Sequence, residues 1–61
     1  MLKLTTFSYG DEIILNPAHI ASICGIPRRH GAAITMANGK VHEVGETVQQ
    51  VHDRIEALFH A

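Results

Sequence analysis

The basic residues of this sequence include one cluster with a chemistry of its own. Arg28, Arg29 and His30 follow one another between a proline and a glycine, and we call residues 27–31 the basic loop. A guanidinium group can form paired hydrogen bonds with a phosphate or a carboxylate. The loop, together with Lys40, is therefore the predicted binding site for an anion or for a protein partner. The alternative is an exposed loop that only aids solubility, since two arginines without interleaved aromatic residues are a poor surface for nucleic acid.

A second pattern has the spacing of metal ligands. His52, Glu56 and His60 are four residues apart from one another, which places them along one side of a helix. Imidazole nitrogen and carboxylate oxygen are ligands of zinc, and a second copy of the chain could complete the four ligands. The alternative is an exposed helix face with hydrogen bonds inside the helix. We expect no resident metal and no cofactor.

Residues for catalysis are present, but they are not arranged in a motif. Cys24 could act as a nucleophile, and a histidine with a carboxylate could act as acid and base. No motif places a base, an orienting group and an oxyanion site together, and 61 residues offer little room for a pocket that excludes water. The sequence therefore predicts a protein that is not an enzyme.

The chain from residue 32 to residue 44 has the pattern of a β-hairpin. Two extended runs flank Asn38 and Gly39, and Asn-Gly is typical of a two-residue type I′ turn. Such a turn pairs Ala37 with Lys40, Met36 with Val41, Thr35 with His42 and Ile34 with Glu43. This register places His42 on the face away from the helix that follows, and Glu43 on the face of Met36.

That helix is predicted over residues 47–60, and its apolar residues recur on one face. Thr47 is the predicted N-cap, and Gln50 completes a capping box. The apolar face consists of Val48, Val51, Ile55, Leu58 and Phe59.

The pattern of the first half of the chain predicts short strands. Leu2 and Leu4 alternate with polar residues, residues 12–15 are expected to pair back as a hairpin, and residues 20–26 follow a turn at Pro17. The prediction is a single α+β domain over residues 1–61, with an antiparallel sheet of four to five strands within residues 1–44 and one C-terminal amphipathic helix. Its expected core consists of Ile14, Leu15, Ile23, Ile34, Met36, Val41, Val51, Ile55 and Leu58, with Leu2 and Leu4 at the edge.

Composition narrows the function classes. A net charge of −1 argues against binding through non-specific phosphate contacts. The sequence contains no apolar run of membrane-spanning length and no signal peptide pattern, so we expect a cytoplasmic protein without membrane insertion. A chain this short commonly gains stability by self-association, which predicts a homo-oligomer, with a dimer favoured.

Several local motifs together resemble one family. They are residues 1–5, Gly10, residues 14–17, Ile20, residues 34–35, residues 38–40, Val44, residues 46–48 and Ile55. With these motifs the chain resembles the small bacterial flagellar FlbD and swarming-motility SwrD type, over nearly its whole length. The basic loop looks like an insertion relative to the short turn expected there. The resemblance implies a non-enzymatic accessory or regulatory protein associated with motility, which acts by binding another protein.

The chain has a second, weaker similarity, to a family of RNA-binding proteins. The opening residues and the Val41-His42 pair are similar to the carbon-storage regulator type of RNA-binding protein. That family needs arginines near the N-terminus and after the Val-His pair, where this chain has Phe7 and Glu43. The alternatives to protein binding are a small nucleic-acid-binding regulator that uses Arg28, Arg29 and Lys40, and a phage-type inhibitor that caps a host protein or sequesters an anionic small molecule.

Overall fold

The computed structural model describes residues 1–59 and confirms the α+β class. Its elements are β1 (Leu2–Thr5), β2 (Glu12–Leu15), the short 3₁₀ helix η1 (Pro17–His19), β3 (Ile20–Gly25), β4 (Ala32–Met36), β5 (Val41–Val44) and α1 (Val48–Phe59). The strands divide into a two-stranded antiparallel sheet, β1–β2, and a three-stranded antiparallel sheet in the order β3–β4–β5. No helix among the described residues is long and apolar enough to cross a membrane.

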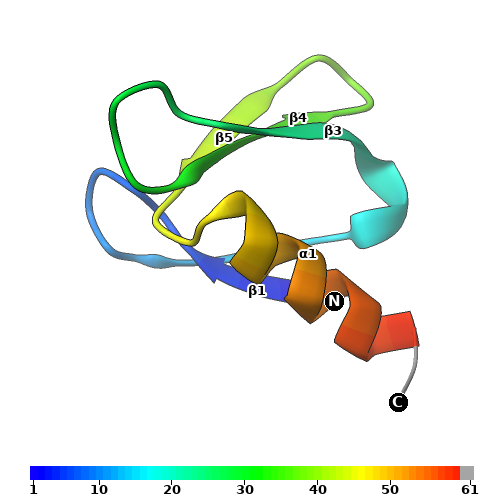
Figure 1. Ribbon diagram of the computed structural model, residues 1–61. Helices are drawn as coiled ribbons and strands as arrows, with labels where there is room; N and C mark the ends of the chain where they lie inside the picture. The colour runs from blue at the N-terminus through cyan, green and yellow to red at the C-terminus, as the bar shows by residue number, and fades with distance from the viewer. Residues whose placement is uncertain (60–61) are drawn as a thin grey trace.

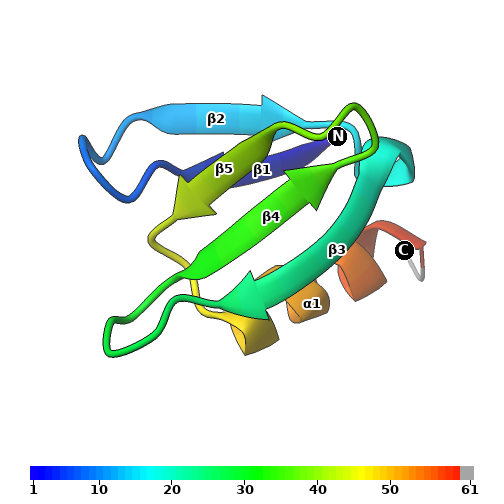
Figure 2. The ribbon, with the colours of Figure 1, turned by 90° about the horizontal axis from the view of Figure 1, so that it is seen from above.

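The two sheets meet along one corner of the molecule. An isolated bridge pairs Thr6 with Val44, and the Gly45 N–H donates to the carbonyl oxygen of Thr5 at 2.8 Å. The helix α1 lies under the three-stranded sheet and beside β1, and it contacts both β1 and β3 (Figures 1 and 2). The helix therefore covers the side that the two sheets leave open, and the core lies between these three parts.

Within the described part of the chain, seven apolar residues build the core. They are Leu2, Leu4, Leu15, Ala32, Ile34, Val44 and Val51, and none of them is more than 6% exposed. Leu2 and Leu4 lie at the centre of the core rather than at its edge, since β1 runs between β2 and α1. Ile13, Ile20, Ile23, Met36 and Ile55 are partly buried against this cluster.

Three of the predicted core residues are exposed, so their assignment was wrong. Ile14 is 53% exposed because the register of β1 and β2 pairs it with Lys3 on the outer face. Leu58 is 42% exposed because it lies near the C-terminal end of α1. Val41 is 58% exposed because the turn before it has one residue more than predicted.

The turn between β4 and β5 has three residues, not two. The Gly39 N–H donates to the carbonyl oxygen of Met36 at 2.9 Å, and the Met36 N–H donates to that of Lys40 at 2.7 Å. Gly39 has a positive φ of 88°, whereas Asn38 does not have a positive φ. This geometry is a type I turn followed by a left-handed glycine, and the predicted type I′ turn was wrong.

The extra loop residue shifts the hairpin register by one. Thr35 pairs with Val41, Ile34 with His42 and Ala33 with Glu43. A shift of one residue turns every side chain of a strand to the other face. His42 therefore lies on the inner face with Ile34, contrary to the prediction, while Val41 and Glu43 lie on the outer face.

The start of α1 agrees with the sequence prediction. The Gln50 N–H donates to Thr47 Oγ1 at 3.1 Å, and the Thr47 N–H donates to Gln50 Oε1 at 2.9 Å. These reciprocal bonds are the predicted capping box, and they satisfy two N–H groups that have no partner within the helix. The predicted last helical residue, His60, lies outside the described residues.

Candidate functional site

The basic loop folds as a tight turn. The Arg29 N–H donates to the carbonyl oxygen of Ile26 at 3.3 Å, with Pro27 at the second position of the turn and Arg28 at the third. Arg28 has a φ of 63°, as the third position of a type II turn requires, although glycine is the usual residue there. The side chains are exposed, and the guanidinium carbon of Arg29 lies 5.8 Å from the ring centre of Phe7.

The fourth residue of the predicted binding site lies elsewhere. The basic loop connects β3 to β4, whereas Lys40 follows the turn at the other end of β4. Figure 2 shows these two connections at opposite ends of the three-stranded sheet. The structure therefore keeps Arg28, Arg29 and His30 together and separates Lys40 from them. Anion or partner binding by the loop stays a prediction.

The predicted metal ligands lie on an exposed side of α1. His52 Nε2 is 3.7 Å from Glu56 Oε1, and His52 Nδ1 is 3.8 Å from Asp53 Oδ1. Within residues 1–59, no three His, Cys, Asp or Glu side chains gather closely enough to hold a metal ion. The third predicted ligand, His60, lies outside the part of the chain that the structure describes.

Sequence reasoning missed a buried carboxylate that fastens α1 to β1. Glu46 is only 8% exposed, and its Oε1 accepts a hydrogen bond from the Thr5 N–H at 3.0 Å. Its Oε2 accepts from Arg54 Nη1 at 3.1 Å, and the same Nη1 donates to the carbonyl oxygen of Lys3 at 3.0 Å. The available signal was an acidic residue directly before the N-cap with an arginine two turns later.

The environment of Glu46 favours its charged form. Burial alone would raise the pKa of this carboxyl, but hydrogen bonds from Thr5 and from the Glu46 backbone, with the positive charge of Arg54, lower the pKa below its ordinary value. Because every contact of this carboxylate joins elements of the fold, we assign it a structural role.

An apolar hollow lies where α1 extends past β1. It has a volume of about 310 Å³, and we call it the β1–α1 groove. Its lining consists of Met1, Leu2, Lys3, Arg54, Ala57 and Leu58. Figure 1 shows the N-terminus beside the C-terminal half of α1, and the lining residues Met1 and Leu58 are 70% and 42% exposed. Large apolar side chains exposed together are typical of a protein contact surface.

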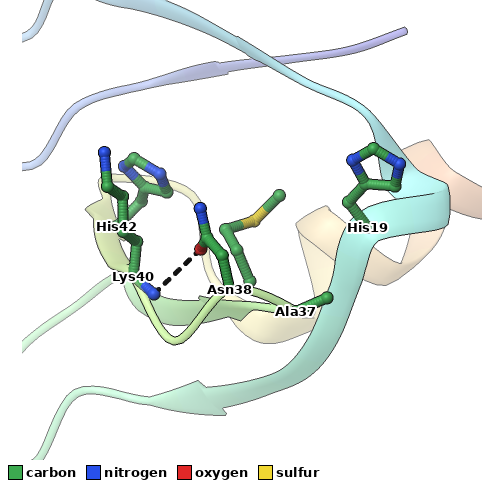
Figure 3. A pocket seen from close by; sticks show the side chains of 6 residues that line it. His19, Ala37, Asn38, Lys40 and His42 are labelled. Atoms are coloured by element: carbon green, nitrogen blue, oxygen red, sulfur yellow. Dashed lines mark hydrogen bonds between the residues drawn. The ribbon is translucent and has the colours of Figure 1, made fainter.

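A more polar hollow lies next to the β4–β5 turn. It has a volume of about 450 Å³, and we call it the hairpin cavity. Its lining consists of His19, Met36, Ala37, Asn38, Lys40 and His42. Figure 3 shows Asn38, Lys40 and His42 close together on the hairpin, with His19 across from them.

Comparison with known proteins identifies the family. The family model described as FlbD, flagellar and swarming motility proteins, matches residues 1–60. No curated protein and no solved structure matches the chain. The match spans all the strands and the helix described above, and it confirms the resemblance seen in the turn and cap motifs. The chain therefore belongs to the FlbD family of flagellar and swarming motility proteins.

Proposed function

We propose that this motility-family protein is a non-enzymatic accessory protein that binds another protein and acts as a homodimer. The β1–α1 groove carries the proposal, because it exposes apolar side chains beside a small core. A single core in a domain of this size rarely supplies more than about 3–5 kcal/mol, and association is a common supplement. We propose that the protein acts in the cytoplasm.

The charges around the groove allow a second copy to dock there. A two-fold contact places the same surface on both subunits, so an unbalanced charge would face its own copy. Lys3 Nζ lies 3.7 Å from Glu12 Oε2, and Arg54 is paired with Glu46. Both cationic side chains of the lining are thus balanced within the chain. Met1 and Leu58 are left as the apolar centre of the proposed contact.

A partner other than a second copy needs a different binding surface. We propose the outer edge of the three-stranded sheet for it. Among residues 1–59, β3 pairs only with β4, and an unpaired strand edge can accept an added strand. The basic loop follows directly after β3, so Arg28 and Arg29 lie beside this edge. We propose that this edge and loop receive an extended segment with acidic residues.

Two observations support this proposal over its alternatives. Cys24 is exposed on the outer face of β3, on the opposite side of the sheet from His42, so the two are not placed as nucleophile and base. The nucleic-acid alternative needs Arg28, Arg29 and Lys40 on one surface, and they lie at opposite ends of β4.

A motility assay tests the proposal. A strain without the gene is complemented with the wild type, with Leu58→Lys and with Val41→Lys, and the swarming radius is measured. Both variants introduce a lysine at an exposed apolar position, but only Leu58 lines the groove. We expect the wild type and Val41→Lys to restore swarming and Leu58→Lys to fail at an equal protein level. Full swarming with Leu58→Lys would exclude the groove as the working contact.

A further inference from the structure

We propose that the hairpin cavity binds a small oxyanion through a phosphate or carboxylate group. This inference concerns a different surface from the β1–α1 groove and is independent of the proposed function. Three features support it: the hydrogen-bond donors that line the cavity, the lack of internal partners for these donors among the described residues, and the backbone hydrogen bonds that join its two sides.

The lining supplies cationic and neutral donors without an acid. Lys40 carries three ammonium N–H donors, and His19 and His42 add imidazole donors from two different elements. None of the described lining residues is an aspartate or a glutamate. An anion placed between these side chains would therefore meet positive charge and N–H groups on more than one side.

Lys40, His19 and His42 differ from most of the remaining lysine and arginine side chains of the fold. Lys3 and Arg54 are paired with carboxylates, and Arg29 lies over an aromatic ring. Among residues 1–59, no hydrogen bond or ion pair involves the side chains of Lys40, His19 or His42. Their donors are thus available to a ligand, and no internal partner competes for them.

Asn38 contributes a donor whose direction is set by the turn. Its Oδ1 accepts a hydrogen bond from the Lys40 N–H at 3.0 Å, which is the dashed line in Figure 3. With the oxygen engaged, the two N–H donors of Nδ2 remain, and Figure 3 shows this nitrogen pointing away from the dashed bond into the hollow.

Backbone hydrogen bonds hold the two sides of the cavity at a fixed distance. The Ala37 N–H donates to the carbonyl oxygen of His19 at 2.7 Å, which ties the hairpin turn to the end of η1. The Met36 N–H donates to the carbonyl oxygen of Lys40 at 2.7 Å and closes the turn. A ligand would find the backbone of both sides already in place, which lowers the cost of binding.

The size and the floor of the cavity set the class of ligand. A volume of about 450 Å³ is within the range of small-molecule sites, and Met36 and Ala37 offer an apolar surface beside the donors. The best-matched ligand is a small organic molecule that bears one phosphate or carboxylate group. Inorganic phosphate and acetate are its simplest probes.

Nuclear magnetic resonance tests the proposal with the full chain. ¹⁵N-labelled protein is titrated near pH 6, where an ordinary imidazole is largely protonated, with phosphate, acetate or chloride at constant ionic strength. We expect saturable amide shifts at His19 and at residues 38–42 with phosphate or acetate, and none with chloride. The anion that binds with the higher affinity then shows whether the ligand carries a phosphate or a carboxylate group.

Matched variants separate the site from general charge attraction. Lys40→Gln and Arg28→Gln each remove one exposed positive charge, at opposite ends of β4. We expect Lys40→Gln to weaken binding about tenfold, as the loss of one charge-assisted hydrogen bond would, and Arg28→Gln to leave it unchanged. His42→Gln, which keeps a side chain of similar length, is expected to weaken binding as well.

Three results would overturn the inference. They are the absence of saturation with both anions, shifts that map to the basic loop, and equal weakening by Lys40→Gln and Arg28→Gln. The spectrum of each variant without anion shows whether it keeps the wild-type fold.

Discussion

The two halves of α1 serve different purposes, although the same apolar pattern runs through both. The first half is anchored: Thr47 and Gln50 cap it, Glu46 fastens its start to β1, and Val51 is fully buried. The second half carries Leu58 and Phe59, which remain 42% and 68% exposed. The helix is thus longer than the core it covers. Its first half stabilises the fold, and its second half offers a surface.

The largest effect is expected from the buried side chain of the anchored half. Val51→Ala removes two methyl groups from a fully buried position, and it should lower the free energy of unfolding by about 2 kcal/mol. Leu58→Ala removes more carbon from an exposed position and should cost less than about 1 kcal/mol in the monomer. Urea denaturation of both variants at low protein concentration measures the contrast. Equal losses would show that the two halves are packed alike.

The next effect concerns the carboxylate that fastens the helix. Glu46→Gln replaces a charged acceptor that bonds Thr5 and Arg54, and it should cost about 1–2 kcal/mol at neutral pH. Arg54 is about half exposed, so its charge contributes less than the geometry alone would indicate.

The pH dependence of this effect has a definite sign. The folded-state pKa of Glu46 is lowered from 4.5, so its contribution is present above that ordinary value and is lost as the pH falls through the lower folded-state value. The wild type should therefore lose its advantage over Glu46→Gln as the pH falls from 4.5 through the lowered folded-state pKa. A constant difference in urea midpoint down to pH 2 would contradict this assignment.

Among the contacts that anchor the first half of α1, the smallest stability effect is expected at the cap. Thr47→Ala removes the hydroxyl that accepts from the Gln50 N–H, and it should cost about 1 kcal/mol. Thr47→Ser keeps a hydroxyl and is the control. Thermal unfolding monitored by circular dichroism compares them, and an unchanged midpoint for Thr47→Ala would mean that packing alone holds the first turn.

The sequence predicted those parts of the fold that depend on neighbouring residues. The capping box at Thr47 and the hairpin at Asn38 and Gly39 are local patterns, and both are present in the structure. The register of that hairpin was missed because Asn-Gly fits both a two-residue loop and a three-residue loop with a left-handed glycine. That one-residue ambiguity reversed the faces of Val41 and His42 and hid the hairpin cavity.

The remaining features depend on contacts between distant parts of the chain. Glu46 bonds Thr5, which lies 41 residues earlier, and no local pattern predicts such a pair. Likewise, the helical periodicity placed Leu58 on the apolar face correctly, but it did not indicate where the sheet beneath that face ends. The candidate contact surface was missed for this reason, since Leu58, at its centre, was assigned to the core.

Sedimentation velocity of the wild type, Leu58→Lys and Val41→Lys tests the central claim most directly. The wild type and Val41→Lys should sediment as dimers, at twice the chain mass of 6.7 kDa, and Leu58→Lys should sediment as a monomer. Val41 is the matched control because it is also an exposed apolar residue, and it lies on the outer face of the three-stranded sheet. A monomeric wild type at high protein concentration, or a Leu58→Lys dimer as stable as the wild type, would contradict self-association through the β1–α1 groove.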